Sequence, residues 1–205
     1  MKITAIVGTY RKGHVIDRAV DEILAAARAS GAETVKIYLL DRRIEFCTNC
    51  RACTQSEGPR RGQCPIQDDM AAILDQIDES DALVLASPMN FWTVTALMKR
   101  FIERTLPYAY WPWGKHAPTG RNRRQRPAKR AVIVVSSAAP SLLARLMTRM
   151  VGLLKGVARL LGAKTVGVLS VGLVSGEENP ELGGCAKRKA RRLGRKLAAG
   201  HTSSA

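Results

Sequence analysis

Apolar residues recur along the chain with two different periods, which predicts that strands and helices alternate. A short apolar run at 2–7 ends at Gly8, and residues 15–29 then place apolar side chains at helical spacing. Gly31 marks the expected end of this helix, and an apolar run at 34–40 follows it. The start of the chain therefore predicts a strand–helix–strand unit.

The same alternation continues to the end of the chain. Further strands are expected at 81–86, 131–135 and 165–171, and further helices at 68–79, 94–105, 141–161 and 183–199. This order predicts an α/β fold with a five-stranded parallel sheet covered by helices on both faces. We expect one domain over residues 1–200, because 205 residues suffice for one sizeable core, and a frayed tail at 201–205.

Two connections are longer than most loops and are therefore candidates for function. The first, residues 41–67, contains four of the five cysteines of the chain: Cys47, Cys50, Cys53 and Cys64. The second, residues 106–129, contains the aromatic run 108–113. We expect this aromatic run to pack in the core or at a subunit interface, and the basic run at 121–130 to be a solvated loop.

The charge balance and the apolar content narrow the class of protein. Lysine and arginine total 33 against 17 acidic residues, a net charge of +16, so the surface attracts anions. The longest apolar region, 150–174, is interrupted by charged residues, and we expect no membrane span. The first apolar run is too short for a signal peptide, and clustered cysteines do not resemble a disulfide framework. These features are typical of a cytoplasmic protein.

The loop after the first predicted strand, residues 8–17, is a candidate phosphate site. Its backbone N–H groups can point at a phosphate, and the positive end of the following helix supports such binding. The loop matches neither G-x-x-x-x-G-K-[ST] nor G-x-G-x-x-G, which argues against an ATPase and a Rossmann site. An ordinary turn that binds nothing is the alternative. Small and hydroxyl-bearing residues also follow two later strands, at 87–93 and 136–140, so the three loops predict one shared ligand site.

Taken together, these motifs resemble the NAD(P)H-dependent FMN reductase and iron-sulfur flavoprotein family. The resemblance rests on Gly8-Thr9-Tyr10-Arg11-Lys12-Gly13, on the cysteine cluster before Asp68-Asp69-Met70, and on Ser87-Pro88-Met89-Asn90-Phe91 followed by Met98-Lys99-Arg100-Phe101. It covers about residues 1–140. It implies a flavodoxin-like, doubly wound sheet of order 2-1-3-4-5 and assembly into a homodimer or homotetramer. It also implies an oxidoreductase that passes electrons from NAD(P)H through FMN to a small-molecule or protein acceptor.

The resemblance further implies which residues bind FMN. Those around the phosphate are Thr9, Arg11, His14, Val15 and Ile16; those along the isoalloxazine ring are Ser87, Pro88, Met89, Asn90 and Phe91; those at its other edge are Ser136, Ser137 and Ala138. The family usually has Asn-Thr or Ser-Asn where Val15-Ile16 stand, so we expect backbone N–H groups and His14 to hold the phosphate. Because the flavin carries the redox chemistry, no side chain is expected to act as a catalytic acid.

The cysteine cluster has three interpretations. Three cysteines at two-residue spacing, with a fourth after ten intervening residues, can surround one tetrahedral centre. The resemblance implies a [4Fe–4S] cluster, although the gap from Cys53 to Cys64 is wider than the compact pattern of the family. Zinc suits the same thiolates. Unmetallated thiols are the third interpretation, because cysteine also packs as a small apolar residue.

Two other functions fit parts of the sequence. A basic flavodoxin-like protein that senses redox state or binds nucleic acid without turnover would account for the +16 charge and the basic segment at 187–196. The sequence shows no helix-turn-helix or RNA-binding motif, however, so we do not expect a nucleic-acid partner. An electron-transfer flavodoxin would not oxidise a nicotinamide, and such proteins are typically acidic and lack the cysteine cluster.

Overall fold

The computed structural model describes residues 1–121 and 129–199. The strands are β1 (Lys2–Val7), β2 (Glu33–Tyr38), β3 (Ala82–Asn90), β4 (Thr93–Val94), β5 (Ala109–Tyr110), β6 (Thr119–Gly120), β7 (Lys129–Ser136) and β8 (Ala163–Val171). The α-helices are α1 (Val15–Arg28), α2 (Met70–Asp78), α3 (Ala96–Glu103), α4 (Ser141–Met147), α5 (Met150–Leu160) and α6 (Gly184–Ala198). The tail expected at 201–205 and most of the basic run at 121–130 lie outside the described residues.

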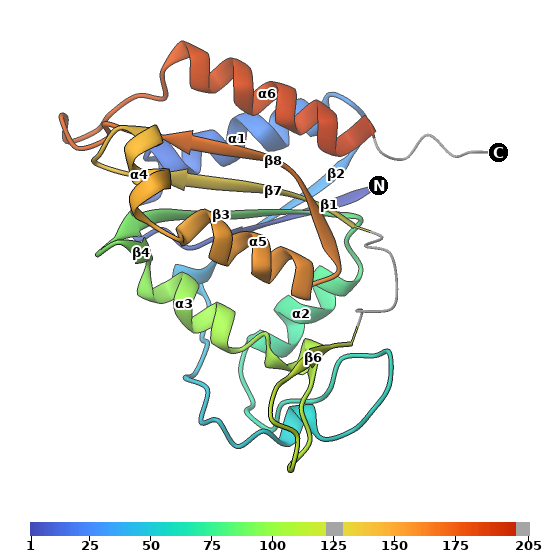
Figure 1. The fold of residues 1–205 in the computed structure, drawn as a ribbon. Helices are drawn as coiled ribbons and strands as arrows, with labels where there is room; N and C mark the ends of the chain where they lie inside the picture. Colours follow the sequence, from blue (N-terminus) through green and yellow to red (C-terminus); the bar gives the residue numbers. More distant parts are fainter. Residues whose placement is uncertain (122–128, 200–205) are drawn as a thin grey trace.

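The main sheet has the predicted topology. Its strands lie in the order β2-β1-β3-β7-β8, and each neighbouring pair along this path is parallel. Counted along the chain, this is the order 2-1-3-4-5 of a flavodoxin-like fold. Helices α1 and α6 cover one face, and α2, α3 and α5 cover the other (Figure 1). The predicted fold class is confirmed.

The core consists of two apolar layers, one on each face of the sheet. Leu83 and Leu85 of β3 belong to the layer under α2, α3 and α5, whereas Val84 and Ala86 belong to the layer under α1 and α6. Successive strand residues point to opposite faces, so a central strand covered on both sides is apolar throughout. This explains why the strands read as continuous apolar runs rather than as alternating ones.

The structure corrects the expected element bounds in two places. The single helix expected at 141–161 is two helices, because Thr148 has extended backbone (φ −128°, ψ 150°) and its hydroxyl donates to the Ala144 carbonyl at 2.9 Å. The strand expected to end at 86 continues to Asn90, and the chain then turns back through Phe91 and Trp92 to pair β4 with the end of β3. None of the described helices has both the length and the apolar content to cross a bilayer.

Candidate functional site

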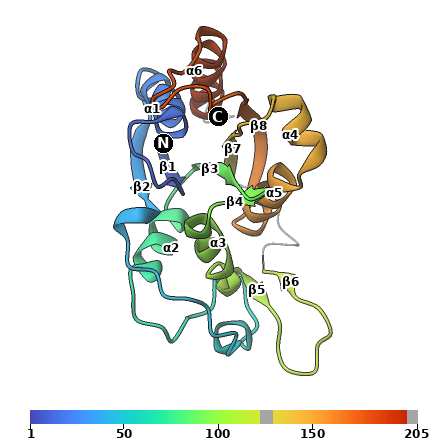
Figure 2. The ribbon, with the colours of Figure 1, turned by 90° about the vertical axis from the view of Figure 1, so that its left-hand side faces the viewer.

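The loops that follow β1, β3 and β7 meet at the carboxyl edge of the sheet. We call residues 8–16, 87–93 and 136–140 together the carboxyl edge; Figure 2 looks onto it. The Gly8 N–H donates to the Ala86 carbonyl at 2.8 Å, and the hydroxyl of Thr95 donates to the Gly8 carbonyl at 2.6 Å. The Ser137 N–H donates to Val171 at 2.9 Å, which ties the third loop to the end of β8. The three loops that the sequence selected are therefore neighbours in space.

The first loop presents free backbone donors. The Thr9 side chain is buried, and its Oγ1 accepts the Arg11 N–H at 3.2 Å, which folds the loop. The His14 side chain makes no capping hydrogen bond to α1. Within the described part of the chain, the N–H groups of His14, Val15 and Ile16 have no acceptor. These donors lie at the positive end of a helix of 14 residues, as an anion-binding loop requires.

The buried carboxylate of Asp17 stabilises this loop, although Asp17 was not among the site residues predicted from the sequence. Asp17 accepts the Gly13 N–H at 2.6 Å and the Tyr38 hydroxyl at 2.7 Å, and it forms an ion pair with Lys36. Burial alone would raise the pKa of Asp17, but these hydrogen bonds outweigh burial and hold the pKa below its ordinary value. Lys36 therefore neutralises the one acidic side chain in the first turn of α1.

The predicted phosphate residue Arg11 contacts another loop. Its Nη2 donates to the Glu178 carbonyl at 2.8 Å, so the side chain joins the first loop to the segment after β8. Gly13 has φ +75°, in the left-handed region that glycine adopts without strain, and this turn directs the chain into α1. The loop conformation thus depends on local backbone geometry as well as on side-chain contacts.

The second loop is a tight hairpin with exposed aromatic residues at its tip. The Ser87 hydroxyl is fully buried; it accepts the Thr95 N–H at 3.1 Å and donates to the Pro88 carbonyl at 2.9 Å. Phe91 and Trp92 have φ 45° and 69°, and their side chains are 95% and 58% exposed. Ser87 therefore fastens the loop, whereas the tip presents its side chains and backbone outward.

The third loop and the hairpin border a small cavity. Met89, Ser136 and Ser137 line it together with residues of α4 and α5. Its volume of about 10 Å³ is room for a single water molecule, so a flavin ring cannot enter it. The predicted ring-binding residues can therefore meet a flavin only on the outer side of these loops. Their roles in binding FMN stay predictions.

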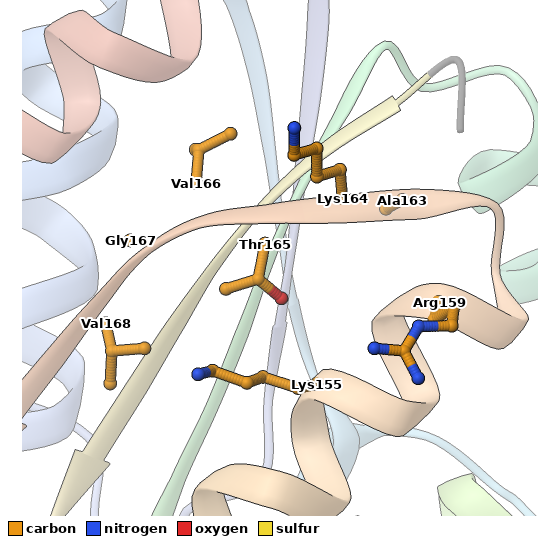
Figure 3. A pocket seen from close by; sticks show the side chains of 8 residues that line it. All are labelled: Lys155, Arg159, Ala163, Lys164, Thr165, Val166, Gly167 and Val168. Atoms are coloured by element: carbon orange, nitrogen blue, oxygen red, sulfur yellow. The ribbon is translucent and has the colours of Figure 1, made fainter. Parts of the chain in front are cut away.

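Two larger grooves lie away from the carboxyl edge. One, of about 440 Å³, follows the free edge of β8 from Ala163 to Val168 and is flanked by Lys155 and Arg159 of α5 (Figure 3). It lies along the first part of β8, whereas the carboxyl edge lies at the strand ends. The other, of about 480 Å³, is mostly apolar and includes Cys47 in its lining.

The clustered cysteines lie near one another in the connection 41–67, which we call the cysteine loop. All four are free thiols, and Cys53 is buried. Burial, followed by the neighbouring thiols of Cys64, Cys47 and Cys50, raises the pKa of Cys53 to about 11. No group of three or more histidine, cysteine or acidic side chains is arranged to hold a metal ion within residues 1–121 and 129–199. The four thiols are thus close enough to influence one another, and their role as metal ligands stays a prediction.

The wide gap between Cys53 and Cys64 is folded compactly. A Cβ atom at Gly62 would lie 1.9 Å from the Cys53 carbonyl oxygen, so only glycine fits there without displacement of the backbone. Arg121 donates to the carbonyls of Cys53 at 3.3 Å and Pro107 at 2.9 Å. The intervening segment therefore returns to Cys53 before it reaches Cys64. Arg121 was expected in a solvated loop; it instead holds this segment.

The aromatic run also packs against the cysteine loop. The Arg51 guanidinium lies 3.9 Å from the ring centre of Trp111 and 4.3 Å from that of Trp113, and its Nη2 donates to the Trp111 carbonyl at 2.6 Å. The backbone of Arg51 lies in the left-handed region, at φ 58°. Tyr108 is buried and donates to Asp78 at 2.7 Å. Tyr108 thus packs within the chain as expected from the sequence, whereas Trp113 at the end of the run is 66% exposed.

Comparison with known proteins relates this geometry to a family. A family model described as NADPH-dependent FMN reductase matches residues 1–178. An iron-sulfur flavoprotein of Archaeoglobus fulgidus is 38% identical over 112 residues, which are 55% of this chain and 49% of that protein. An iron-sulfur flavoprotein of Methanocaldococcus jannaschii is 35% identical over 107 residues, 52% of this chain and 53% of that protein. The match thus spans about half the length of these curated relatives.

Solved structures resemble the whole fold at low sequence identity. An FMN-dependent NADH-azoreductase from Bacillus anthracis, solved in complex with FMN, gives a TM-score of 0.71 at 12% identity and covers 97% of this chain and 100% of that one. An NAD(P)H:quinone oxidoreductase from Methanothermobacter marburgensis gives 0.69 at 20% identity, with 99% and 98% covered. These likenesses establish the flavodoxin-like fold. Because the family model spans most of the sequence, the chain belongs to the NADPH-dependent FMN reductase family, whose members are FMN-dependent NAD(P)H oxidoreductases.

Proposed function

We propose that this chain binds FMN at the carboxyl edge, takes electrons from NAD(P)H and passes them to a small-molecule or protein acceptor. The observation that carries the proposal is the meeting of three ligand-type loops at the ends of adjacent parallel strands, beside the free N–H groups of α1. Bound FMN would supply the redox chemistry, because it can accept a hydride and pass on electrons. The protein residues bind and orient it.

The phosphate end of FMN fits the first loop by its donor chemistry. The N–H groups of His14, Val15 and Ile16 would donate to phosphate oxygens at the positive end of α1. Lys36 neutralises the charge of Asp17, so this carboxylate in the first turn of α1 repels the phosphate dianion of FMN less strongly. This arrangement compensates for the hydroxyl that Val15 and Ile16 lack.

The ring end of FMN fits the other two loops. Backbone N–H groups of Met89 and Phe91 would face the carbonyl-bearing edge of the ring, where donors favour electron uptake, whereas Asn90 is paired with Thr93 of β4. Residues 136–138 would border the opposite side. Two residues in the left-handed region at the hairpin tip fix the direction of this backbone. Each such residue costs about 1–2 kcal/mol in backbone strain, which is typical of ligand-binding segments.

Flavin binding and turnover can be tested with two assays. When FMN is titrated into flavin-free protein, its fluorescence is expected to fall until one FMN is bound per chain. In the second assay, protein with bound FMN is expected to oxidise NADPH or NADH, whereas flavin-free protein is not. Thr9→Val, which removes the acceptor of the Arg11 N–H, should weaken FMN binding; Thr34→Val, on β2, serves as the matched control. Protein that binds no FMN at millimolar concentration would overturn the proposal.

We also propose that Cys47, Cys50, Cys53 and Cys64 hold a [4Fe–4S] cluster. Four neighbouring thiols are the donor set that such clusters use, and the tight packing of Gly62 on Cys53 brings the chain back before Cys64. The curated relatives that match about half of the chain are named iron-sulfur flavoproteins. Iron, sulfide and zinc assays on anaerobically purified protein distinguish the interpretations: about four irons per chain support the cluster, one zinc supports a structural site, and neither metal supports free thiols.

The exposed face of α4 supports assembly into a homodimer or homotetramer. Leu142, Leu143, Leu146 and Met147 are all exposed on this short helix beside the carboxyl edge, and Leu146 is 77% exposed. Apolar groups gathered in this way are typical of surfaces that another protein covers. Leu142→Ser combined with Leu146→Ser is expected to lower the mass measured by light scattering; a monomeric wild type would contradict this assembly.

A further inference from the structure

A charged pair buried below the cysteine loop has no role in binding FMN. Arg104 follows the end of α3 and is only 2% exposed, and the Asp68 side chain is fully buried. Arg104 Nη1 donates to Asp68 Oδ2 at 2.6 Å and to the Glu45 carbonyl at 2.7 Å. Nη2 donates to Asp68 Oδ1 at 3.1 Å and to the Cys64 sulfur at 3.6 Å. One of the four predicted metal ligands is therefore in direct contact with a buried cation.

Asp68 is fully satisfied without any help from Cys64. Besides the two donors from Arg104, its carboxylate accepts the Glu45 N–H at 2.7 Å and the Met70 N–H at 3.0 Å. Burial alone would raise the pKa of Asp68, but these hydrogen bonds hold it below its ordinary value. The ion pair between Asp68 and Arg104 is therefore complete without Cys64. The N–H group that Arg104 directs at the Cys64 sulfur is an additional contact.

The chemistry of sulfur suggests what this additional donor does. A neutral thiol is a weak acceptor, whereas a thiolate accepts a charge-assisted hydrogen bond well. A metal centre keeps its cysteine ligands as thiolates, and hydrogen bonds to cluster sulfurs raise the reduction potential because they favour the more negative state. A guanidinium that is fixed by a buried carboxylate keeps its orientation toward the sulfur.

We propose that Arg104 is a positioning residue that orients Cys64 as a cluster ligand and makes the cluster easier to reduce. This inference rests on the proposed [4Fe–4S] cluster. The residue acts through the sulfur of Cys64 and has no part in hydride transfer.

The position of Arg104 separates its effect from flavin binding. Thr95, at the start of α3, is tied to the carboxyl edge, whereas Arg104 follows the opposite end of the helix and contacts the cysteine loop (Figure 1). The eight residues of α3 span about 12 Å at 1.5 Å per residue. A change at Arg104 should therefore alter the cluster while FMN binding serves as the internal control.

The test compares two variants of the pair with one control. Arg104→Lys keeps the positive charge, but a single ammonium lacks the planar fork that contacts Asp68 and Cys64 together. The double variant Asp68→Asn/Arg104→Gln removes both charges, so no uncompensated charge is left buried if the single variant folds poorly. Lys99→Gln removes an exposed cation from the same helix and controls for overall charge. Measured quantities are iron per chain, the cluster midpoint potential by electron paramagnetic resonance titration, and the FMN dissociation constant.

Both pair variants are expected to lower the cluster midpoint potential by about 59 mV, a tenfold shift in a one-electron equilibrium. The FMN dissociation constant of both pair variants should stay within about twofold of the wild-type value, well below the tenfold change that 1.4 kcal/mol represents. Lys99→Gln should match the wild type in both the potential and the FMN dissociation constant. Unchanged potentials in both pair variants, or an equal shift in Lys99→Gln, would overturn the role of Arg104 while leaving the cluster intact. Iron-free wild type would instead overturn the cluster itself, and with it this role.

Discussion

The carboxyl edge and the cysteine loop are held in place by different kinds of contact. At the carboxyl edge, backbone groups of neighbouring strand ends bond to one another, and short hydroxyl side chains such as Ser87 and Thr95 complete the contacts. In the cysteine loop, regular structure is limited to Asp41, the last residue of a 3-10 turn, and to a 3-10 turn at Ala52–Thr54, and arginine side chains donate to the backbone carbonyls of the loop.

This difference has a physical origin. Parallel strands end together, so their loops are placed by the sheet itself and need few side-chain contacts. A long connection has no such scaffold, and its backbone carbonyls must find other donors. Arg104 and Arg121 supply them from other parts of the chain, and Arg51 of the loop itself donates outward to the Trp111 carbonyl. Single substitutions should therefore disturb the cysteine loop more than the carboxyl edge.

The largest effect is expected from Asp68→Ala. It leaves the buried Arg104 guanidinium without its carboxylate, which should lower the free energy of unfolding by about 3–5 kcal/mol. Urea titration followed by circular dichroism measures this loss. Glu103→Ala, which removes the exposed partner of Lys99, is the control and should cost less than about 1 kcal/mol. Similar small losses in both variants would show that the buried pair does not hold the loop.

The next largest effect is expected from Gly62→Ala. The added Cβ would meet the Cys53 carbonyl, so the segment must shift, at about 1–3 kcal/mol. Iron retention should fall while FMN binding persists. In the same assays Gly152→Ala, on α5, where a Cβ meets no atom within 4 Å, should leave both unchanged and slightly stabilise the helix. Iron retained in Gly62→Ala at the wild-type level would contradict the proposed packing role.

Next to the carboxyl edge, in the first turn of α1, Asp17→Asn is expected to change the pH dependence of stability. The folded-state pKa of Asp17 lies below its ordinary value of 3.8, so the ionised carboxylate stabilises the protein above that value. This contribution is lost as the pH falls through the lower folded-state pKa. The variant should be less stable than the wild type by about 1.5–2 kcal/mol at neutral pH and should approach it in strong acid. A constant difference at every pH, measured by thermal unfolding, would contradict this account.

The smallest effect is expected from Thr95→Val. The variant loses the hydrogen bond to the Gly8 carbonyl and the cap of α3, at about 1 kcal/mol. FMN affinity should weaken several-fold, because the first loop loosens, whereas iron content should not change. Thr93→Val, at an exposed position of β4, is the comparison variant. A loss of iron without a loss of FMN affinity in Thr95→Val would reverse the proposed division between the two regions.

The two regions also differ in how far the sequence predicts them. Strand and helix periodicity placed the carboxyl edge, since strands that alternate with helices leave few topologies. The hairpin tip at Phe91 and Trp92 escaped prediction, because neither residue type indicates a left-handed backbone. Thr148 likewise gives no periodic signal for a helix break.

In the cysteine loop, sequence spacing identified the thiols but not what holds them. The contact between Arg104 and Asp68 joins residues 36 positions apart, and that between Arg121 and Cys53 joins residues 68 apart. Such pairs leave no mark on local periodicity, so Arg104 reads as an ordinary charge at the end of a helix. The one feature of the sequence that could have indicated this contact is the position of Arg104 next to the apolar face of the helix that precedes it.

We propose two separable centres in this chain, FMN at the carboxyl edge and iron in the cysteine loop. The most direct measurement is FMN titration together with iron analysis of the wild type and of a variant in which Cys47, Cys50, Cys53 and Cys64 are all serine. If the two centres are separable, both proteins bind FMN equally and only the wild type contains iron. Absence of FMN binding by the wild type, or equal iron in both proteins, would contradict it.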